Sequence, residues 1–207
     1  MAYDGCMSPR ADAVRSRERI LEVARGHDAR ALRLNDVARD AGVGIGTVYR
    51  HFPTVRALIE ALSLDSLARL RDAADAAARE PDPQRALHRF LGRALDLQLD
   101  DAGLEAVLTD IARTDPVVHN ECAAARTAVF AGYSAVLTRA QRAGVVRDDI
   151  SAAQLHRLVC GIEHAVRLGT REDCTVLLDI LLAGIRPEPQ NSSKAAVMTA
   201  GAGTSAG

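Results

Sequence analysis

Residues 35–52, NDVARDAGVGIGTVYRHF, constrain the fold of this chain more than any other stretch. Val37, Ala38 and Ala41 give a first short helix one apolar face. Gly42 supplies the stop of that helix, because glycine adopts a positive φ at little cost. A second helical period begins a few residues later. Two short helices joined at a glycine corner are typical of a helix-turn-helix motif.

The second helix of this motif has two faces, since each residue turns the helix by about 100°. The inward face is predicted to carry Ile45, Val48 and Phe52, at i, i+3 and i+7. A surface helix in an ordinary bundle would show the same pattern, so the pattern alone leaves both interpretations open. The outward and flanking positions are Gly46, Thr47, Tyr49, Arg50 and His51.

These outward residues match the chemistry of a DNA groove. Gly46 lets the backbone approach a duplex closely, and Thr47 can contact a thymine methyl group or a phosphate. Arg50 can donate two hydrogen bonds to O6 and N7 of guanine. Tyr49 and His51 stand where flanking side chains reach phosphates. The helix is therefore predicted to bind in the major groove.

Residues 41–54, AGVGIGTVYRHFPT, resemble the DNA-binding signature of the tetracycline-repressor (TetR) family of transcriptional regulators. The resemblance extends over about residues 15–62. It implies an all-α fold, with an N-terminal three-helix helix-turn-helix domain and a C-terminal helical domain for ligand binding and dimerisation. It also implies three partners: a double-stranded DNA operator, a small-molecule effector and a second copy of the chain.

The chain departs from the family pattern at several positions. Gly44 and Ile45 stand where many members carry Ser and Lys or Arg. Lysine is also frequent in the family at position 55, and the neighbouring Arg56 is its nearest substitute here. Arg33 occupies the usual position of a Ser or Thr cap, which leaves Asn35 as the available cap. The predicted DNA contacts are Arg33, Asn35, Gly44, Ile45, Gly46, Thr47, Tyr49, Arg50, His51 and Arg56.

Composition supports a helical chain and limits its contact with nucleic acid. Aromatic residues make up 3% of the 207 residues, while Ala and Leu abound, which favours helices over sheets. The net charge is −1, so the protein does not have the strongly basic surface of a protein that coats nucleic acid. Residues 1–56 nevertheless carry ten Arg against seven acidic residues. A modest basic end on an acidic body fits local DNA contact.

Cysteine usage and hydropathy favour a soluble, cytoplasmic protein. Cys6, Cys122, Cys160 and Cys174 show no C-x-x-C spacing and no small secreted framework. The N-terminus lacks the apolar core of a signal peptide, and no apolar run approaches the roughly 20 residues that span a bilayer. No spacing of Ser, His and Asp indicates a catalytic site, so neither enzyme activity nor a cofactor is predicted.

Apolar periodicity and cap signals divide the chain into four segments. These are a loose N-terminal segment (1–13), the DNA-binding domain (14–56), the ligand-binding and dimerisation domain (57–186) and a disordered tail (187–207). The predicted helices cover about residues 15–26, 35–41, 45–52, 53–79, 83–97, 103–113, 116–142, 152–168 and 171–182. Helix caps are predicted at Asp82, Ser151 with Gln154, and Thr170.

The last predicted helix is apolar almost all round. Such a helix must be covered, and a two-fold partner is the simplest cover. In the TetR family the last two helices pair with their mates in a four-helix dimer interface, so the resemblance implies a homodimer. The predicted interface residues are Leu155, Val159, Ile162, Val166, Leu177 and Leu181.

A ligand site in the C-terminal domain is implied by the resemblance and not by residue spacing. Helical cavities lined by apolar groups and a few polar ones are common small-molecule sites. Any one of the candidates taken alone is better explained as a core residue. The candidates are Phe90, Gln98, Leu108, Ile111, His119, Tyr133 and His164.

One constellation indicates a different effector. His156, Cys160 and His164 fall at i, i+4 and i+8, within about 80° of one another on one helix face. This spacing suits part of a zinc or copper site, which Cys174 or His119 would complete. A chance arrangement on an amphipathic helix is the alternative explanation, so metal binding is not part of the main prediction.

The main prediction is a dimeric, ligand-responsive transcriptional repressor. Two recognition helices would enter successive major grooves of a palindromic operator, about 34–36 Å apart. A small, largely apolar ligand that favours another spacing would shift the population off DNA, through the helix that begins at Pro53. The alternative is a metal- or redox-responsive DNA-binding sensor that uses His156, Cys160 and His164.

Overall fold

The computed structural model describes residues 9–109 and 120–187, and within these ranges the chain is all α-helical, as predicted. The ranges exclude two predicted ligand residues, Ile111 and His119. No helix of this described part is long and apolar enough to span a bilayer. The helices are α1 (Pro9–Arg25), α2 (Leu34–Ala41), α3 (Ile45–His51), α4 (Val55–Leu62), α5 (Leu64–Arg79), α6 (Pro83–Asp100), α7 (Ala102–Thr109), α8 (Asn120–Arg142), α9 (Ala152–Leu168) and α10 (Asp173–Gly184).

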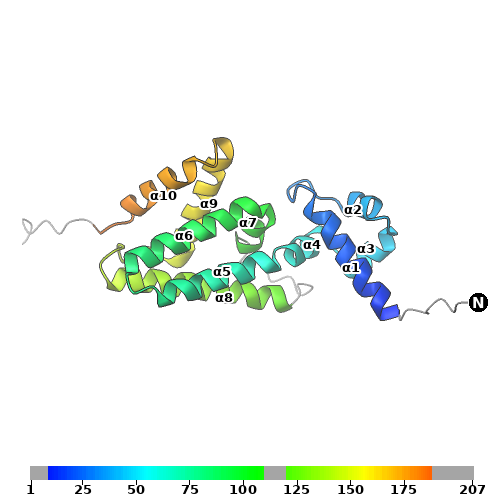
Figure 1. Cartoon of the computed structure of the whole chain (residues 1–207), viewed down its shortest axis with the longest axis horizontal. Helices are drawn as coiled ribbons and strands as arrows, with labels where there is room; N and C mark the ends of the chain where they lie inside the picture. The colour runs from blue at the N-terminus through cyan, green and yellow to red at the C-terminus, as the bar shows by residue number, and fades with distance from the viewer. Residues whose placement is uncertain (1–8, 110–119, 188–207) are drawn as a thin grey trace, which may run out of the picture.

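The N-terminal helices enclose a small core of their own. α1, α2 and α3 form a group at one end of the molecule, and α4 leads from it to a longer helical body (Figure 1). Val37, Val48 and Phe52 are fully buried in this small core, and α1 and α4 contribute Ile20 and Leu58. The helix-turn-helix therefore packs on α1 and α4 through its periodic apolar residues.

The C-terminal body is a helical bundle around a second core. α5 packs along α8, and α6 contacts α5, α8, α9 and α10. The inner face of α6 buries Leu87, Phe90 and Leu91. Phe90 packs edge-on against Tyr133 with ring centroids 4.7 Å apart, and Tyr133 lies 5.6 Å from the ring of His156. An aromatic cluster thus occupies the centre of the bundle.

Two of the predicted helix starts are confirmed. The side chain of Asp82 accepts hydrogen bonds from the backbone N–H groups of Gln84 and Arg85, at 2.9 and 3.3 Å, at the start of α6. Ser151 and Gln154 form the reciprocal capping box at the start of α9. Both caps satisfy N–H groups that have no partner within the helix.

Two other predicted boundaries are wrong. α1 begins at Pro9, earlier than predicted, because the first turn of a helix accommodates proline. α10 begins at Asp173, and Thr170 is not its cap. The backbone N–H of Thr170 instead donates to the carboxylate of Asp173 at 2.9 Å. The acidic side chain closes this turn in place of the threonine hydroxyl.

The helix predicted to run from Pro53 into the body is two helices that meet at Ser63. Thr54 caps α4, since its hydroxyl accepts from the N–H of Ala57 at 3.0 Å. Ser63 is fully buried, with φ −84° and ψ −2°. Its hydroxyl lies 3.3 Å from the carboxylate of Asp101, which precedes α7. A polar contact at the bend therefore ties the end of α4 to the body.

The two parts of the molecule pack closely where α4 meets α7. Gly103 lies so near α4 that an added Cβ would stand 2.8 Å from Cγ2 of Ile59 and 3.1 Å from Oγ of Ser63. A larger residue would push the helices apart. Glycine here allows the close approach of α4 to the C-terminal body.

Candidate nucleic-acid interface

A tight turn connects α2 to α3, as the glycine corner predicts. Gly42 has φ +64° and ψ +33°, in the left-handed region that favours glycine. Its N–H donates to the carbonyl of Arg39 at 3.1 Å, and the N–H of Val43 donates to that of Ala38 at 3.0 Å. The end of α2 is therefore closed by its own backbone, and α3 starts at a fixed place.

α3 turns one face to the core and the other to solvent. Val48 is fully buried, whereas Tyr49 is 51% exposed and Arg50 is also exposed. Thr47 and His51 are half-buried at the margin. The division matches the predicted one at Val48, Arg50 and His51. Thr47, predicted to face outward, lies at the margin, whereas Tyr49, predicted on a flank, is the more exposed of the two.

Ile45 is a further exception on α3. It was predicted to face inward, but its side chain is 38% exposed. Ile45 is the first residue of the helix, so no preceding helical turn covers it. The outer surface of α3 therefore includes an apolar group at its start.

Gly44 and Gly46 flank Ile45 at the start of α3 and leave the backbone uncovered at their own two positions. A Cβ added at either position would meet no atom within 4 Å, and neither glycine has a positive φ. Neither packing nor backbone conformation therefore requires glycine at these two positions. The result is bare backbone facing open space at the helix N-terminus.

His51 lies beside two arginines. Its pKa is lowered below the usual 6.5, first by burial and then by the positive charges of Arg17 and Arg50. The guanidinium carbon of Arg17, from α1, stands 5.5 Å from the ring centroid of Phe52, within cation–π distance. Sequence analysis missed Arg17, because only folding brings α1 to the end of α3. His51 is neutral at pH 7, next to two fixed positive charges.

The other predicted DNA contacts lie at the edges of the motif. Arg33 is exposed and is itself the N-cap residue of α2, without a side-chain hydrogen bond. Asn35 is therefore not the cap, and is an exposed residue of the first turn. Nε of Arg56 donates to the buried carboxylate of Glu60 at 2.8 Å. The charge of Arg56 is thus matched within the protein, and its contact with DNA stays a prediction.

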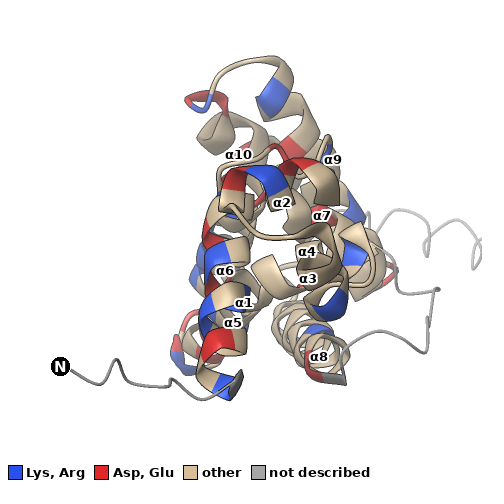
Figure 2. Ribbon diagram, turned by 90° about the vertical axis from the view of Figure 1, so that its right-hand side faces the viewer, with Lys and Arg blue, Asp and Glu red and all other residues tan. Residues whose placement is uncertain are grey.

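The charge on this end of the molecule is mixed. Figure 2 looks onto the end that carries α1 to α3, where basic and acidic segments both occur. Arg39 forms ion pairs with Asp36 and Asp40 on α2. Across the described ranges neither Arg33 nor Arg50 takes part in an ion pair. Positive charge without a carboxylate partner in the described ranges therefore occurs at the start of α2 and on α3, and also on α1, where Arg17 lies near His51.

The predicted ligand residues are divided between core and surface. Phe90, Leu108 and Tyr133 are buried, whereas His164 is exposed on α9 and so cannot line an internal cavity. Gln98 is fully buried too. Neither amide atom of Gln98 nor the hydroxyl of Tyr133 has a hydrogen-bond partner among the described residues. An unsatisfied buried polar group costs about 1–3 kcal/mol, so these two side chains mark a polar requirement inside the bundle.

Most of the predicted dimer residues belong to the core of the protomer. Leu155, Val159, Val166 and Leu181 are buried, and Ile162 and Leu177 are half-buried. The bundle covers this stripe itself because α6 and α8 pack against α9. The sequence does hold a sign of a different apolar face, because Val176 and Ile180 are spaced i, i+4 on α10. The exposed large apolar residues of α9 and α10 are Leu158, Leu168, Val176 and Ile180.

The metal-site alternative does not assemble. Sγ of Cys160 lies 3.5 Å from Nε2 of His156, but His164 is exposed. Burial lowers the pKa of His156 to about 4 and raises that of Cys160 to about 12. Within residues 9–109 and 120–187, no group of three or more His, Cys, Asp or Glu side chains is placed to hold a metal ion. The helical spacing of the three residues therefore does not produce a shared site.

Two protein-family models match the chain. Residues 18–62 match bacterial regulatory proteins of the tetR family, and residues 82–187 match the C-terminal domain of SbtR-like transcriptional regulators. The comparison with curated protein sequences found no match.

Solved structures share the fold. A TetR transcriptional regulator from Streptomyces coelicolor is 30% identical, with 84% of this chain and 99% of that chain covered and a TM-score of 0.52. PfmR of Thermus thermophilus is 20% identical, with 84% and 100% covered and a TM-score of 0.54. FadR of Bacillus subtilis, solved in complex with stearoyl-CoA, is 13% identical, with 84% and 99% covered and a TM-score of 0.56.

The glycine turn, the buried inner face of α3 and its exposed outer face define a DNA-binding protein of the helix-turn-helix class. The helical body that follows and the two matched models narrow this class further. The chain belongs to the TetR family of transcriptional regulators, as the signature at residues 41–54 indicates.

Proposed function

We propose that the protein is a dimeric repressor that binds a palindromic operator and is released by a small, largely apolar ligand. The outer face of α3 is the observation that carries this proposal. Tyr49 and Arg50 project from a helix whose start is bare backbone at Gly44 and Gly46. Bare backbone allows close approach to a duplex, and the N–H groups of a helix N-terminus favour a phosphate.

Each exposed group of α3 has a role in this proposal. Arg50, which forms no ion pair with the residues that the structure describes, reads guanine through O6 and N7, and Ile45 contacts a thymine methyl group. Tyr49 and Arg17 contact phosphates on either side. His51 contacts a phosphate at the end of the helix.

Dimerisation is proposed through the exposed apolar side chains of α9 and α10. Val176 and Ile180 lie one turn apart on α10 and are 60% and 61% exposed. Burying a large aliphatic side chain contributes about 1.5–3 kcal/mol, so a two-fold contact at this surface is favourable. Such a contact would set two copies of α3 about one turn of DNA apart, about 34–36 Å.

The ligand is proposed to enter the bundle near Gln98 and Tyr133. These buried side chains offer an amide and a hydroxyl that have no hydrogen-bond partner among the described residues, and Tyr133 lies beside the rings of Phe90 and His156. A largely apolar ligand with one or two polar atoms would satisfy them. FadR of Bacillus subtilis, which shares the fold, was solved in complex with stearoyl-CoA, a ligand with a long apolar chain.

A chain of charged contacts links this region to the DNA-binding end. Arg167 donates to the carbonyl of Gln98 at 2.9 Å and pairs with the buried Glu163. Glu163 also pairs with Arg30, on the turn between α1 and α2. A ligand that moves the end of α6 therefore changes the support of the DNA-binding part, and this shifts the population away from DNA.

Gel retardation tests the proposal, with DNA that flanks the coding region and the variant Arg50→Ala. The matched control is Arg25→Ala, which removes an exposed arginine of α1 outside the motif. We expect specific retardation that is lost in Arg50→Ala and kept in Arg25→Ala. Specific retardation that survives in Arg50→Ala would contradict the assigned role of α3.

A further inference from the structure

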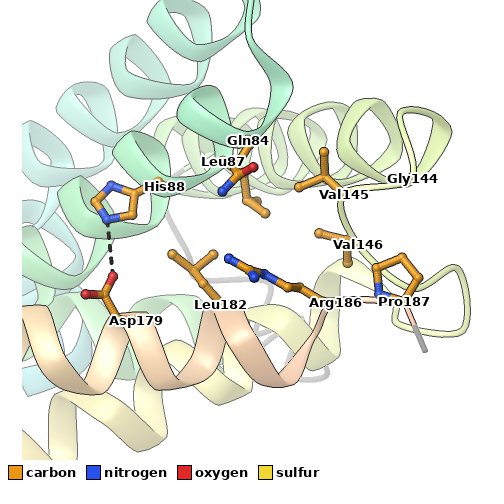
Figure 3. A pocket seen from close by; sticks show the side chains of 10 residues that line it. All are labelled: Gln84, Leu87, His88, Gly144, Val145, Val146, Asp179, Leu182, Arg186 and Pro187. Carbon is orange, nitrogen blue, oxygen red and sulfur yellow. Dashed lines mark ion pairs between the residues drawn. The ribbon is translucent and has the colours of Figure 1, made fainter. Parts of the chain in front are cut away.

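A pocket opens between α6 and α10, at the end of the body away from α1–α3 (Figure 1, Figure 3). Its volume is about 610 Å³, in the range of small-molecule sites. The walls come from the first turns of α6, the connection between α8 and α9, and the end of α10. The N–H of Arg147 donates to the carbonyl of Ile185 at 3.0 Å, which fastens the connection to α10. This hydrogen bond holds one wall of the pocket against another.

The lining combines an apolar floor with a polar rim. Asp179 lies 3.6 Å from Nε2 of His88. The carboxylate of Asp179 therefore has a partner within the protein. Arg186 takes part in no ion pair with the described residues, and Figure 3 shows its side chain running back along α10 toward the middle of the pocket. Gln84 adds an amide at the opposite wall. The apolar floor consists of Leu87, Val145, Val146 and Leu182.

We propose that this pocket binds an amphiphilic carboxylate, held at its charged end by Arg186 and along its apolar body by the floor. A guanidinium matches a carboxylate with two parallel hydrogen bonds, and the amide N–H group of Gln84 is a further donor. A cationic ligand would meet the unmatched charge of Arg186. A ligand without charge would leave that guanidinium unused at the mouth of an apolar site.

The helical geometry of α10 connects the pocket to the proposed dimer contact. At about 100° per residue, Asp179, Leu182 and Arg186 share one side of the helix. Val176 and Ile180 share another side, roughly 90° away. A ligand that wedges α10 from α6 would therefore tilt the proposed dimer surface. This regulatory consequence rests on the proposed function, whereas the binding itself does not.

Isothermal titration of the full-length protein with octanoate tests the binding, and octan-1-ol serves as the uncharged probe of equal length. Arg186→Ala removes the proposed anchor. Arg142→Ala is the matched control, since it removes an exposed arginine at the end of α8 that does not line the pocket. We expect saturable octanoate binding that weakens at least about tenfold in Arg186→Ala and stays unchanged in Arg142→Ala. Octan-1-ol should bind more weakly than octanoate.

Hydrogen–deuterium exchange then locates the bound octanoate. We expect protection at residues 84–88, 144–147 and 182–186. No saturable binding, equal binding of octan-1-ol, or equal affinity in wild type and Arg186→Ala would overturn the proposal. Protection confined to residues around Gln98 and Tyr133 would also overturn it, and would favour the ligand site proposed for the bundle core. The gel retardation above uses no ligand, so failure of either proposal is distinguishable from failure of the other.

Discussion

The guanidinium of Arg30 lies 3.7 Å from the carboxylate of Glu163, which is 1% exposed on α9. Arg30 belongs to the turn between α1 and α2, and it also reaches Glu105 of α7 at 3.5 Å. Glu163 has a second partner in Arg167. A buried charge of the ligand-binding body is thus partly neutralised by the DNA-binding part, in addition to the packing of α4 on α7.

Arg30→Ala should lower the free energy of unfolding by about 1 kcal/mol, because Glu163 keeps only one of its two cations. Urea unfolding measures this change. In a double-mutant cycle with Glu163→Gln, most of this loss in the free energy of unfolding should appear as coupling energy between the two residues. Arg69→Ala removes an exposed pair with Asp65 and should change the stability less. Zero coupling between Arg30 and Glu163 would show that the contact does not join the two parts.

Gly46→Ala should separate folding from DNA binding. An added Cβ at this position meets no atom within 4 Å, and alanine favours a helix over glycine by roughly 0.5–1 kcal/mol. The variant should therefore be slightly more stable in urea while binding the operator roughly tenfold more weakly in gel retardation. Gly92→Ala on α6, where a Cβ would make an ordinary 3.6 Å contact, should leave DNA binding unchanged. Unaltered affinity in Gly46→Ala would mean that α3 does not approach the duplex at this point.

His156 should make the protein less stable in mild acid. Burial lowers its pKa to about 4, below the 6.5 of an unperturbed histidine, so the unfolded chain takes up the proton first. The contribution of the neutral ring is complete above pH about 6.5 and is lost as the pH falls toward 4. The loss amounts to about 3 kcal/mol. Urea unfolding of wild type and His156→Gln at several pH values measures this loss. The carboxylates titrate in both proteins, so the difference between the two curves reports His156. Parallel curves would contradict the assignment.

Ile180→Glu should dissociate the proposed dimer. The side chain is 61% exposed in the protomer, so the substitution is tolerated there, but a buried carboxylate at an apolar two-fold contact is costly. Light scattering after size-exclusion chromatography should give the mass of one chain. Val14→Glu places the same charge on another exposed apolar residue, on α1, and should remain dimeric. Wild-type protein of monomeric mass at all concentrations would rule out the proposed assembly.

Local signals in the sequence predicted much of the fold. Gly42 ends α2 in the left-handed conformation, and Asp82 and Ser151 cap α6 and α9, because each device depends only on neighbours within a few residues. The buried position of Val48 follows from helical periodicity in the same way.

Features that depend on distant parts of the chain were missed. Ser63 interrupts the predicted long helix, and its side chain is in contact with Asp101, which no local pattern reveals. Leu155 and Val159 were assigned to the dimer because an apolar stripe does not say which neighbour covers it. The folded bundle covers them itself, and leaves Ile180 among the exposed apolar residues.

Selection of bound fragments from a random DNA library tests the central claim most directly, for wild type, Arg50→Ala and His51→Ala. We predict a palindrome whose half-sites are centred about one helical turn apart. Arg50→Ala should lose the preference for guanine at one position of each half-site, whereas His51→Ala should keep the motif at lower affinity. A motif without two-fold symmetry, or an unchanged motif in Arg50→Ala, would contradict the account.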